Sequence, residues 1–326
     1  MAGDAVSGTG PANVTKYYIE NLPEGTLYQK RRGRISRVPE IIVNTLRCDA
    51  AVYSGYSLQN ILGFRLAKLF GKPSAYIMHG CVEYENGINL EPDESMSRAE
   101  REMMGLTDVI IAVSSGFAAW LREHYPLYSD KIRHITNGID LPDREIPFDR
   151  GKSHMILSVG GGMPRKKIRY ICEAVGKLRA LYDPELYVCV IGAEGADTGA
   201  IDSYDFVKDM GLVDEKECMR LYSEADLFVQ NSCFETFGLA VLEALSRGCP
   251  ILCSRHVGAL ELFGELREED VIDDCEDPDE IAGKIRYNLE NSNAKRLYAA
   301  LSGESDSWKE RARALESLMS ELVLKK

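Results

Sequence analysis

The chain has 326 residues, of which 45% are hydrophobic and 28% are charged, a composition typical of a globular protein with one or two cores. Its 39 lysines and arginines are outnumbered by 51 aspartates and glutamates, which gives a net charge of −12. Nucleic acid binds basic surfaces, so this balance disfavours it as the main partner. No apolar run approaches the roughly 20 residues that a membrane-spanning helix needs.

The nine cysteines are scattered and form no CxxC pair, and their odd number rules out a complete set of disulfides within one chain. The N-terminal stretch "MAGDAVSGTGPANV" lacks the charged start and apolar core of a signal peptide. We therefore expect a cytoplasmic protein with reduced thiols.

Short apolar runs alternate with helical patterns along the chain, which predicts an α/β fold with parallel sheets. In the first half, strands are expected at 51–55, 74–80, 108–115 and 131–138, and helices at 57–71 and 116–125. In the second half, strands are expected at 154–162, 186–195, 226–230 and 250–254, and two or three helices close the chain.

The stretch 141–152 is polar, contains prolines and has no periodicity, so it is interpreted as a linker. We expect two doubly wound, Rossmann-like domains over 1–145 and 146–326. The last helix either stays with the second domain or packs back on the first domain. Ligands of open parallel sheets bind beyond the carboxyl ends of the strands, so the site is expected in a cleft between the two domains.

The stretch "SCFETFGLAVLEALSRGCP" (232–250) contains two glutamates in an apolar run. Gly248 and the proline that follows predict the end of a helix that starts near 236–238. Glu235 then lies at the helix start, where free N–H groups favour negative charge, and Gly238 allows a ligand close to the backbone. Glu243 lies further in, and its carboxylate suits a pair of adjacent hydroxyls. The alternative, left open, is that Glu235 caps the helix and Glu243 pairs with a core arginine.

The stretch "SVGGGMPRKKI" (158–168) places three glycines between a strand and the cations Arg165, Lys166 and Lys167. A flexible loop rich in N–H groups beside cations suits a diphosphate. Glycine-rich turns and solvated lysine pairs are also common without any ligand, so the feature alone is weak.

His79 ends the expected strand in "YIMHGCVEYENG", where a residue lining a cleft would lie, although a structural histidine is the commoner case. The glycine-rich stretch 7–14 either presents N–H groups or is a loose terminus. The acidic stretch 273–277 is assigned to helix capping rather than to a metal. The basic run 30–34 is either a solvated face or a contact with an anionic membrane or acceptor.

Together these stretches resemble the family 4 glycosyltransferases, retaining enzymes of the two-Rossmann GT-B fold. The segment "SCFETFGLAVLEA" is similar to that family's signature, two glutamates separated by seven residues, and "ITNGID", "LYSEADLFVQ" and "RGCPILCS" resemble its flanking segments. The resemblance covers nearly the whole chain and is strongest over 131–262. "SAYIMHGCVEYENGIN" is similar to bacterial members that build surface polysaccharides or glycans.

The resemblance implies roles for the glutamate segment in binding the donor. Glu235 would contact hydroxyls of the donor sugar, helped by the backbone of Phe237, Gly238 and Leu239, and Glu243 would bind the ribose diol.

It also implies roles for the two glycine-rich loops and the histidine. Lys166 and Arg165 would hold the diphosphate, and Gly161 occupies a loop position where the family usually has an arginine. His79 would lie beside the transferred sugar, and Gly10 near the phosphates or acceptor. The family also opens with a strand that is short or missing here.

The implied activity is transfer of a sugar, with retained anomeric configuration, from a nucleotide-diphosphate sugar to a hydroxyl acceptor in bacterial polysaccharide or glycoconjugate synthesis. A UDP-sugar is the favoured donor, and no metal or cofactor is expected. The catalytic residues would be Glu235, Lys166, Arg165 and His79. The acceptor would be a glycan, a lipid-linked glycan or a glycosylated protein, with peripheral contact to the inner face of a membrane near Arg31. A sugar-nucleotide epimerase of the same fold and a non-catalytic subunit that supports a partner enzyme remain as alternatives.

Overall fold

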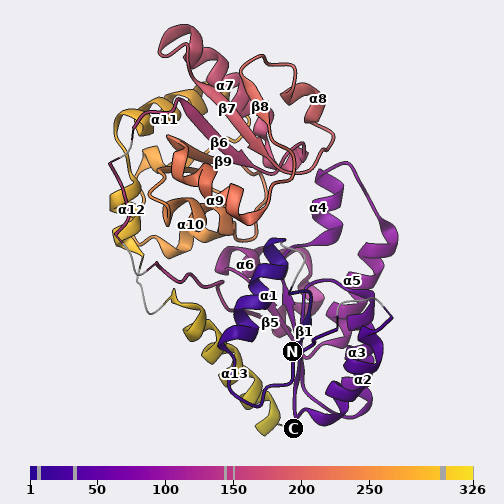
Figure 1. Cartoon of the computed structure of the whole chain (residues 1–326). Coiled ribbons are helices and arrows are strands. Elements are labelled where there is room, and N and C mark those ends of the chain that lie inside the picture. Colours follow the sequence, from indigo (N-terminus) through magenta and orange to yellow (C-terminus); the bar gives the residue numbers. More distant parts are fainter. Residues whose placement is uncertain (6–8, 32–34, 143–144, 150, 302–305, 326) are drawn as a thin grey trace. The chain divides into compact units, whose positions relative to one another are not determined.

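The computed structural model describes the whole chain except residues 6–8, 32–34, 143–144, 150, 302–305 and 326 (Figure 1). The chain forms two compact units. Unit 1 comprises Met1–Tyr84, Pro92–Asp140 and Gly303–Lys326, and unit 2 comprises Glu85–Glu91 and Leu141–Ser302. The C-terminal segment therefore belongs to unit 1, whereas the expected second domain ran to residue 326.

Unit 1 contains a parallel sheet of five strands in the order β1-β2-β3-β4-β5. The strands are β1 (Ala2–Gly3), β2 (Ala51–Ser54), β3 (Ser74–Met78), β4 (Val109–Ala112) and β5 (Ile132–His134). The interior strands β3 and β4 are buried over their whole length, as is usual for parallel strands covered on both faces. The predicted strands are confirmed, with narrower bounds.

The strand order of unit 1 differs from the expected doubly wound order, because it follows the sequence without a reversal. A reversal needs later strands to pair with the far side of the first strand. Here β1 has only two residues, and among the described residues the later strands all add to one side of it. Leu27 and Gln29 hydrogen bond to Met1, the residue before β1, without forming a strand. The expectation of a short first strand is confirmed.

Seven α-helices lie in or start in the described part of unit 1. They are α1 (Gly10–Asn21), α2 (Arg37–Arg47), α3 (Leu58–Leu69), α4 (Val82–Ile88), α5 (Glu94–Leu106), α6 (Ser115–His124) and α13 (Trp308–Leu324), with the 3-10 helix η1 at Pro126–Lys131. None of the helices in the described residues is long and apolar enough to cross a membrane.

Unit 2 contains a parallel sheet of six strands in the order β11-β10-β9-β6-β7-β8. The strands are β6 (Met155–Val159), β7 (Tyr187–Ile191), β8 (Val207–Asp209), β9 (Leu227–Gln230), β10 (Ile251–Ser254) and β11 (Val271–Ile272). This is the predicted doubly wound order. The order reverses between β6 and β9, which pair side by side (Figure 1), so a ligand site is expected beyond their carboxyl ends.

The helices of unit 2 cover this sheet. They are α7 (Ile168–Leu181), α8 (Thr198–Ile201), α9 (Glu215–Glu224), α10 (Leu239–Leu245), α11 (Pro278–Glu290) and α12 (Ala294–Ala300), with 3-10 helices at Pro164–Lys166 (η2), Gly258–Leu262 (η3) and Glu268–Asp270 (η4). The apolar side of α7 and residues of α11 join the strands in one buried core. Asp277 caps α11 by accepting hydrogen bonds from two backbone N–H groups, which confirms the capping assignment for 273–277.

The C-terminal helix α13 is anchored to unit 1 by its first residue. The Trp308 ring is 2% exposed and stacks on Tyr17 with ring centroids 4.9 Å apart. Its backbone N–H donates to Asp140 Oδ1 at 3.1 Å. Gly138 is required beside it, because a Cβ there would lie 2.8 Å from the Trp308 backbone. A large buried aromatic ring therefore fixes the C-terminal segment to unit 1.

We expect Trp308→Ala to destabilise unit 1 by about 3–5 kcal/mol, because it removes the buried ring and leaves a cavity. The midpoint of thermal unfolding, followed by circular dichroism, measures this. Leu324→Ala on the same helix is the control, since Leu324 is 87% exposed and its loss should change stability by less than about 0.5 kcal/mol. Equal effects of the two substitutions would contradict the anchoring role of Trp308.

Candidate functional site

Glu235 lies at the reversal of strand order in unit 2 and is held there by two cations. It follows β9, and the η2 turn that follows β6 carries Arg165 and Lys166. Lys166 Nζ forms an ion pair with Glu235 Oε2, and Arg165 NH1 lies 3.5 Å from the same oxygen. The side chains of all three are only 11–14% exposed. The carboxylate therefore has protein partners in the ligand-free chain.

The charges of this cluster are mutually supportive. Burial would by itself raise the pKa of Glu235, but the positive charges of Lys166 and Arg165 and hydrogen bonds from Lys166 and Gln230 hold the pKa below its usual value. Burial also lowers the pKa of Lys166, and the adjacent Arg165 adds to this, while Glu235 acts in the opposite direction. Each charge is tolerated at low exposure because the others are present.

Backbone hydrogen bonds attach the η2 turn to the segment after β9. The Cys233 N–H donates to Arg165 O at 2.9 Å, and Arg165 NH1 donates to Phe234 O at 3.3 Å. Arg165 NH2 also pairs with Glu85 at 3.4 Å, within unit 2. The cations are thus positioned by the turn and by its neighbour along the sheet, rather than by flexible side chains alone.

The glycine loop after β6 is closed rather than open to a ligand. The N–H groups of Gly160 and Gly161 donate to Ile191 O at 2.7 and 2.9 Å, and the N–H of Gly162 donates to Ala193 O at 3.0 Å. Gly161 has φ +55°, and a Cβ there would lie 2.0 Å from Ala193 O. The expectation that these N–H groups are available to a diphosphate is wrong for the ligand-free chain, because the last residue of β7 and the loop after it accept their hydrogen bonds. The glycines are explained by this close backbone packing.

The start of α10 depends on Gly238. This residue has φ +93° and immediately precedes Leu239, the first residue of the helix. Phe237 is 2% exposed, and its carbonyl accepts a hydrogen bond from the Ala259 N–H at 2.7 Å. The helix ends at Leu245, three residues before Gly248, which the sequence predicted as the signal for the end of the helix. Glu235 lies three residues before the cap Gly238 and is not a capping residue, so that alternative is wrong.

Glu243 lies on α10 and has a different environment. The hydroxyl of the buried Tyr222 on α9 donates to Glu243 Oε2 at 3.4 Å. No ion pair among the described residues includes Glu243, so the alternative of a core arginine is not found there. Burial raises the pKa of Glu243, the Tyr222 hydrogen bond opposes this, and the charge of Glu215 adds to it. This carboxylate is therefore only partly compensated by the protein.

His79 follows β3 in unit 1, at the carboxyl end of the strand as predicted. Ser54 Oγ lies 2.8 Å from His79 Nε2 and 2.7 Å from Thr15 Oγ1, which donates to Pro11 O at 2.9 Å. The single Thr15 hydrogen is used by Pro11, so Ser54 donates to Thr15 and accepts from His79. The hydrogen of His79 is thus on Nε2. Burial lowers the pKa of His79 to about 4, so the ring is neutral at neutral pH.

Two predicted segments lie partly outside the described residues. Gly10 is the first residue of α1 and has no neighbour near its missing Cβ, while residues 7 and 8 of the glycine-rich stretch are not described. In the basic run, Lys30 and Arg31 are described, and their N–H groups donate to the Glu40 carboxylate at 3.0 and 2.9 Å. Residues 32–34 are not described. The roles of Gly10 and Arg31 stay predictions.

One His/Asp/Glu group with ligand atoms in metal-binding proximity occurs among the described residues. It includes the residue before β6, whereas the predicted site follows the carboxyl end of that strand. It comprises His154, Asp183 and Glu185. Lys152 Nζ lies 2.6 Å from Asp183 Oδ2, and this hydrogen bond is the main reason that the pKa of Asp183 falls to about 2. The lysine already supplies the positive charge that a cation would bring.

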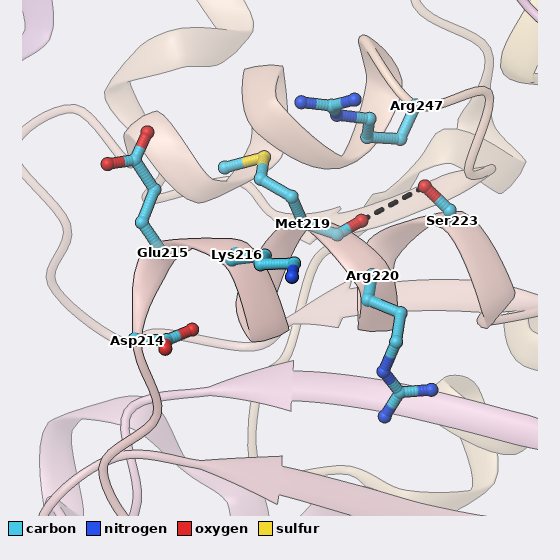
Figure 2. A pocket seen from close by; sticks show the side chains of 7 residues that line it. All are labelled: Asp214, Glu215, Lys216, Met219, Arg220, Ser223 and Arg247. Carbon is cyan, nitrogen blue, oxygen red and sulfur yellow. Dashed lines mark hydrogen bonds between the residues drawn. The ribbon is translucent and has the colours of Figure 1, made fainter.

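A hollow of about 690 Å³ on the surface of unit 2 is lined by α9, its cap and the residue two positions after α10 (Figure 2). Figure 2 shows Asp214, Glu215, Lys216, Met219, Arg220, Ser223 and Arg247 around it. None of the residues predicted for the site lines this hollow.

Sequence reasoning missed two residues that contact the glutamates. Gln230, the last residue of β9, donates from Nε2 to Glu235 Oε2 at 2.8 Å, and Tyr222 contacts Glu243. The available signal for Gln230 was a polar side chain at the carboxyl end of a strand that is otherwise apolar.

Residues 142–314 match the family model described as "Glycosyl transferases group 1", and residues 4–142 match the model described as "Glycosyltransferase Family 4". A D-inositol 3-phosphate glycosyltransferase of Paenarthrobacter aurescens is 27% identical over 288 residues, which cover 78% of this chain and 69% of that protein.

Two solved structures share the fold. Sucrose-phosphate synthase from Thermosynechococcus elongatus superposes with a TM-score of 0.66 at 20% identity, over 94% of this chain and 83% of that one. Anabaena HepE in complex with UDP and glucose gives a TM-score of 0.68 at 12% identity, over 98% of both chains. These likenesses confirm the predicted GT-B fold class. The chain belongs to the group 1 glycosyl transferases and is a glycosyltransferase of the family 4 type.

Proposed function

We propose that this glycosyltransferase takes its sugar from a UDP-sugar, binds that donor through unit 2 and transfers the sugar with retained configuration. The observation that carries the proposal is the buried cluster of Glu235, Lys166 and Arg165 at the strand-order reversal of unit 2. Anions and sugars bind at this place in doubly wound sheets. The UDP complex of HepE supports uridine as the base.

In this proposal Lys166 and Arg165 bind the diphosphate and stabilise the charge that develops on it as the sugar leaves. No metal is invoked, because these cations supply the positive charge. Glu235, released from Lys166, accepts hydrogen bonds from hydroxyls of the sugar. Glu243 accepts hydrogen bonds from the ribose diol, which gives its under-compensated carboxylate two donors.

The reaction proceeds through an oxocarbenium-like transition state. The bond between the anomeric carbon and the diphosphate oxygen breaks, and the acceptor oxygen forms the new bond on the same face of the sugar. The acceptor proton passes to the departing diphosphate, so no protein base is needed. His79 is neutral at neutral pH and is assigned to contact the transferred sugar. The acceptor is proposed to be a glycan or glycoconjugate of a bacterial surface polysaccharide pathway.

A peripheral contact between unit 1 and an anionic membrane is part of the proposal. Ile35 precedes α2 and is 88% exposed, while Val43 and Leu46 on α2 are 49% and 44% exposed. These apolar side chains recur at helical spacing and are accompanied by Arg31 and Arg47. Exposed apolar groups next to basic ones are typical of surfaces that bind anionic lipid.

We expect Lys166→Ala to lower kcat/KM for donor turnover by about 100- to 1000-fold, as when other groups that stabilise a developing anion are removed. Lys167→Ala is the matched control, because Lys167 pairs with Glu276 instead of with Glu235, and it should change kcat/KM less than about threefold. The assay incubates the protein with a panel of sugar nucleotides, with and without membrane extract. A changed sugar nucleotide without acceptor would indicate an epimerase, and similar effects of both substitutions would contradict the role of Lys166.

The two glutamates should respond oppositely to neutralisation in the ligand-free protein. The pKa of Glu235 is lowered, so its charge stabilises the fold above the usual carboxyl pKa of about 4.3 and this contribution is lost as the pH falls through the lowered value. Glu235→Gln should therefore lower the melting temperature at pH 8, by an amount that corresponds to about 3–5 kcal/mol. The pKa of Glu243 is raised, so its contribution is present at low pH and is lost as the pH rises through the raised value. Glu243→Gln should raise the melting temperature at pH 8.

The difference for Glu243→Gln should shrink near pH 4, where the raised pKa leaves Glu243 protonated. The difference for Glu235→Gln should largely persist at pH 4, because the lowered pKa keeps Glu235 ionised until the pH falls further. Thermal unfolding of the two variants and the parent at pH 8 and near pH 4 measures them. Shifts of the same sign at pH 8 would show that the two carboxylates do not have the environments described.

We expect the protein to bind vesicles of phosphatidylcholine and phosphatidylglycerol, and the double substitution Val43→Asp and Leu46→Asp to abolish most of that binding. Aspartates remove apolar contact and are repelled by the anionic lipid. Leu181→Asp in unit 2 is the control, since Leu181 is 88% exposed and lies far from α2 in sequence. Co-flotation measures the bound fraction. Equal loss in both variants, or no binding by the parent, would contradict the membrane contact.

A further inference from the structure

The side chain of Gln230 has one satisfied end and one unsatisfied end. It is the last residue of β9 and is 3% exposed. Its Nε2 donates to Glu235 Oε2 at 2.8 Å. Its Oε1 is buried and accepts no hydrogen bond from any described residue. A buried acceptor without a donor is rare in folded proteins and indicates a bound water or a ligand group.

The orientation of this amide is dictated by its neighbour. An ionised carboxylate only accepts hydrogen bonds, so the amide nitrogen of Gln230 must be the atom that meets Glu235. The reversed amide would place two acceptor oxygens against each other. The unsatisfied atom is therefore the carbonyl oxygen, and what it lacks is a donor.

Glu235 is asymmetric in the same way. Lys166, Arg165 and Gln230 all contact Oε2, and no described residue donates to Oε1. The side chain is 12% exposed. Two acceptor oxygens, Glu235 Oε1 and Gln230 Oε1, thus belong to side chains joined by a single hydrogen bond. Two acceptors on side chains that are hydrogen-bonded to each other suit two hydroxyl donors of one ligand.

The backbone of Gly238 packs directly against these two side chains and against Val257, since a Cβ there would lie 3.1 Å from Val257 Cγ1. Gly238 has no Cβ, and a Cβ there would lie 3.3 Å from Glu235 Cγ and 3.7 Å from Gln230 Nε2. Because residue 238 is a glycine, no side chain of this residue lies between the backbone at the start of α10 and the side chains of Glu235 and Gln230.

We propose that Gln230 is a specificity-determining residue of the donor site, whose Oε1 accepts a hydrogen bond from a sugar hydroxyl next to the hydroxyl bound by Glu235 Oε1. The proposal rests on the proposed function, since it places the donor sugar at Glu235. The site then selects neutral sugars with two adjacent free hydroxyls. A sugar that lacks one of the two hydroxyls leaves a buried acceptor oxygen without a donor. A sugar with a carboxylate in place of a hydroxyl brings further acceptor oxygens against Glu235 and Gln230.

The test compares the parent with Gln230→Met, which keeps the length of the side chain and removes both polar ends. Gln59→Met on α3 of unit 1 is the matched control. Isothermal titration measures binding of UDP-glucose, UDP-galactose, UDP-N-acetylglucosamine, GDP-mannose, free UDP and free GDP. We expect Gln230→Met to weaken the sugar nucleotide that the parent binds best by about 10- to 100-fold, and to change the matching free nucleotide less than about twofold.

Equal weakening of the sugar nucleotide and the free nucleotide, or no weakening of either, would overturn the role of Gln230 and leave the proposed function standing. Failure of the parent to bind any nucleotide of the panel would overturn the proposed function and this inference with it. Circular dichroism of both variants establishes that they are folded.

A second comparison separates direct contact from an effect through Glu235. If Gln230 contacts the sugar, Gln230→Met still weakens the sugar nucleotide about tenfold when it is added to Glu235→Gln. If Gln230 serves only to orient Glu235, the second substitution causes no further loss, and the direct contact is overturned.

Discussion

The ion pair between Lys166 and Glu235 is the interaction on which the site depends. Each residue follows a different central strand of the unit 2 sheet, β6 or β9, and the two strands meet where the strand order reverses. Neither charge would be stable alone at about 11–12% exposure. The fold thus holds two charges that compensate each other at one place. In the proposed complex the diphosphate would be the new partner of Lys166, and the sugar would be the new partner of Glu235.

The burial of Glu235 and the burial of Glu243 are compensated in different ways. Glu235 is satisfied by protein cations and keeps a lowered pKa, whereas Glu243 has one tyrosine hydroxyl and a raised pKa. The ion pair of Glu235 with Lys166 suits a carboxylate that exchanges a protein partner for a ligand when the ligand binds. The Glu243 carboxylate, with a single hydrogen-bond donor from the protein, suits a group that accepts further hydrogen bonds from ligand hydroxyls.

Much of this was accessible from sequence, because local patterns determine it. The strands before His79, the glycine loop and Glu235 were all recognisable as apolar runs, and the segment with the two glutamates was singled out as a candidate site. The strands β8 and β11, with three and two residues, are too short for a periodic signal. Other features depend on distant residues: Ile191 and Ala193 take the glycine-loop N–H groups, Lys166 pairs with Glu235, and the Gln230 oxygen lacks a donor. No local pattern reveals such long-range pairing.

A crystal structure of the protein with a bound sugar nucleotide tests the central claim most directly. The account predicts that Lys166 Nζ leaves Glu235 Oε2 for a diphosphate oxygen and that Glu235 accepts hydrogen bonds from the sugar. A complex in which the nucleotide binds elsewhere, while Lys166 and Glu235 stay paired with each other and contact no part of it, would contradict the account.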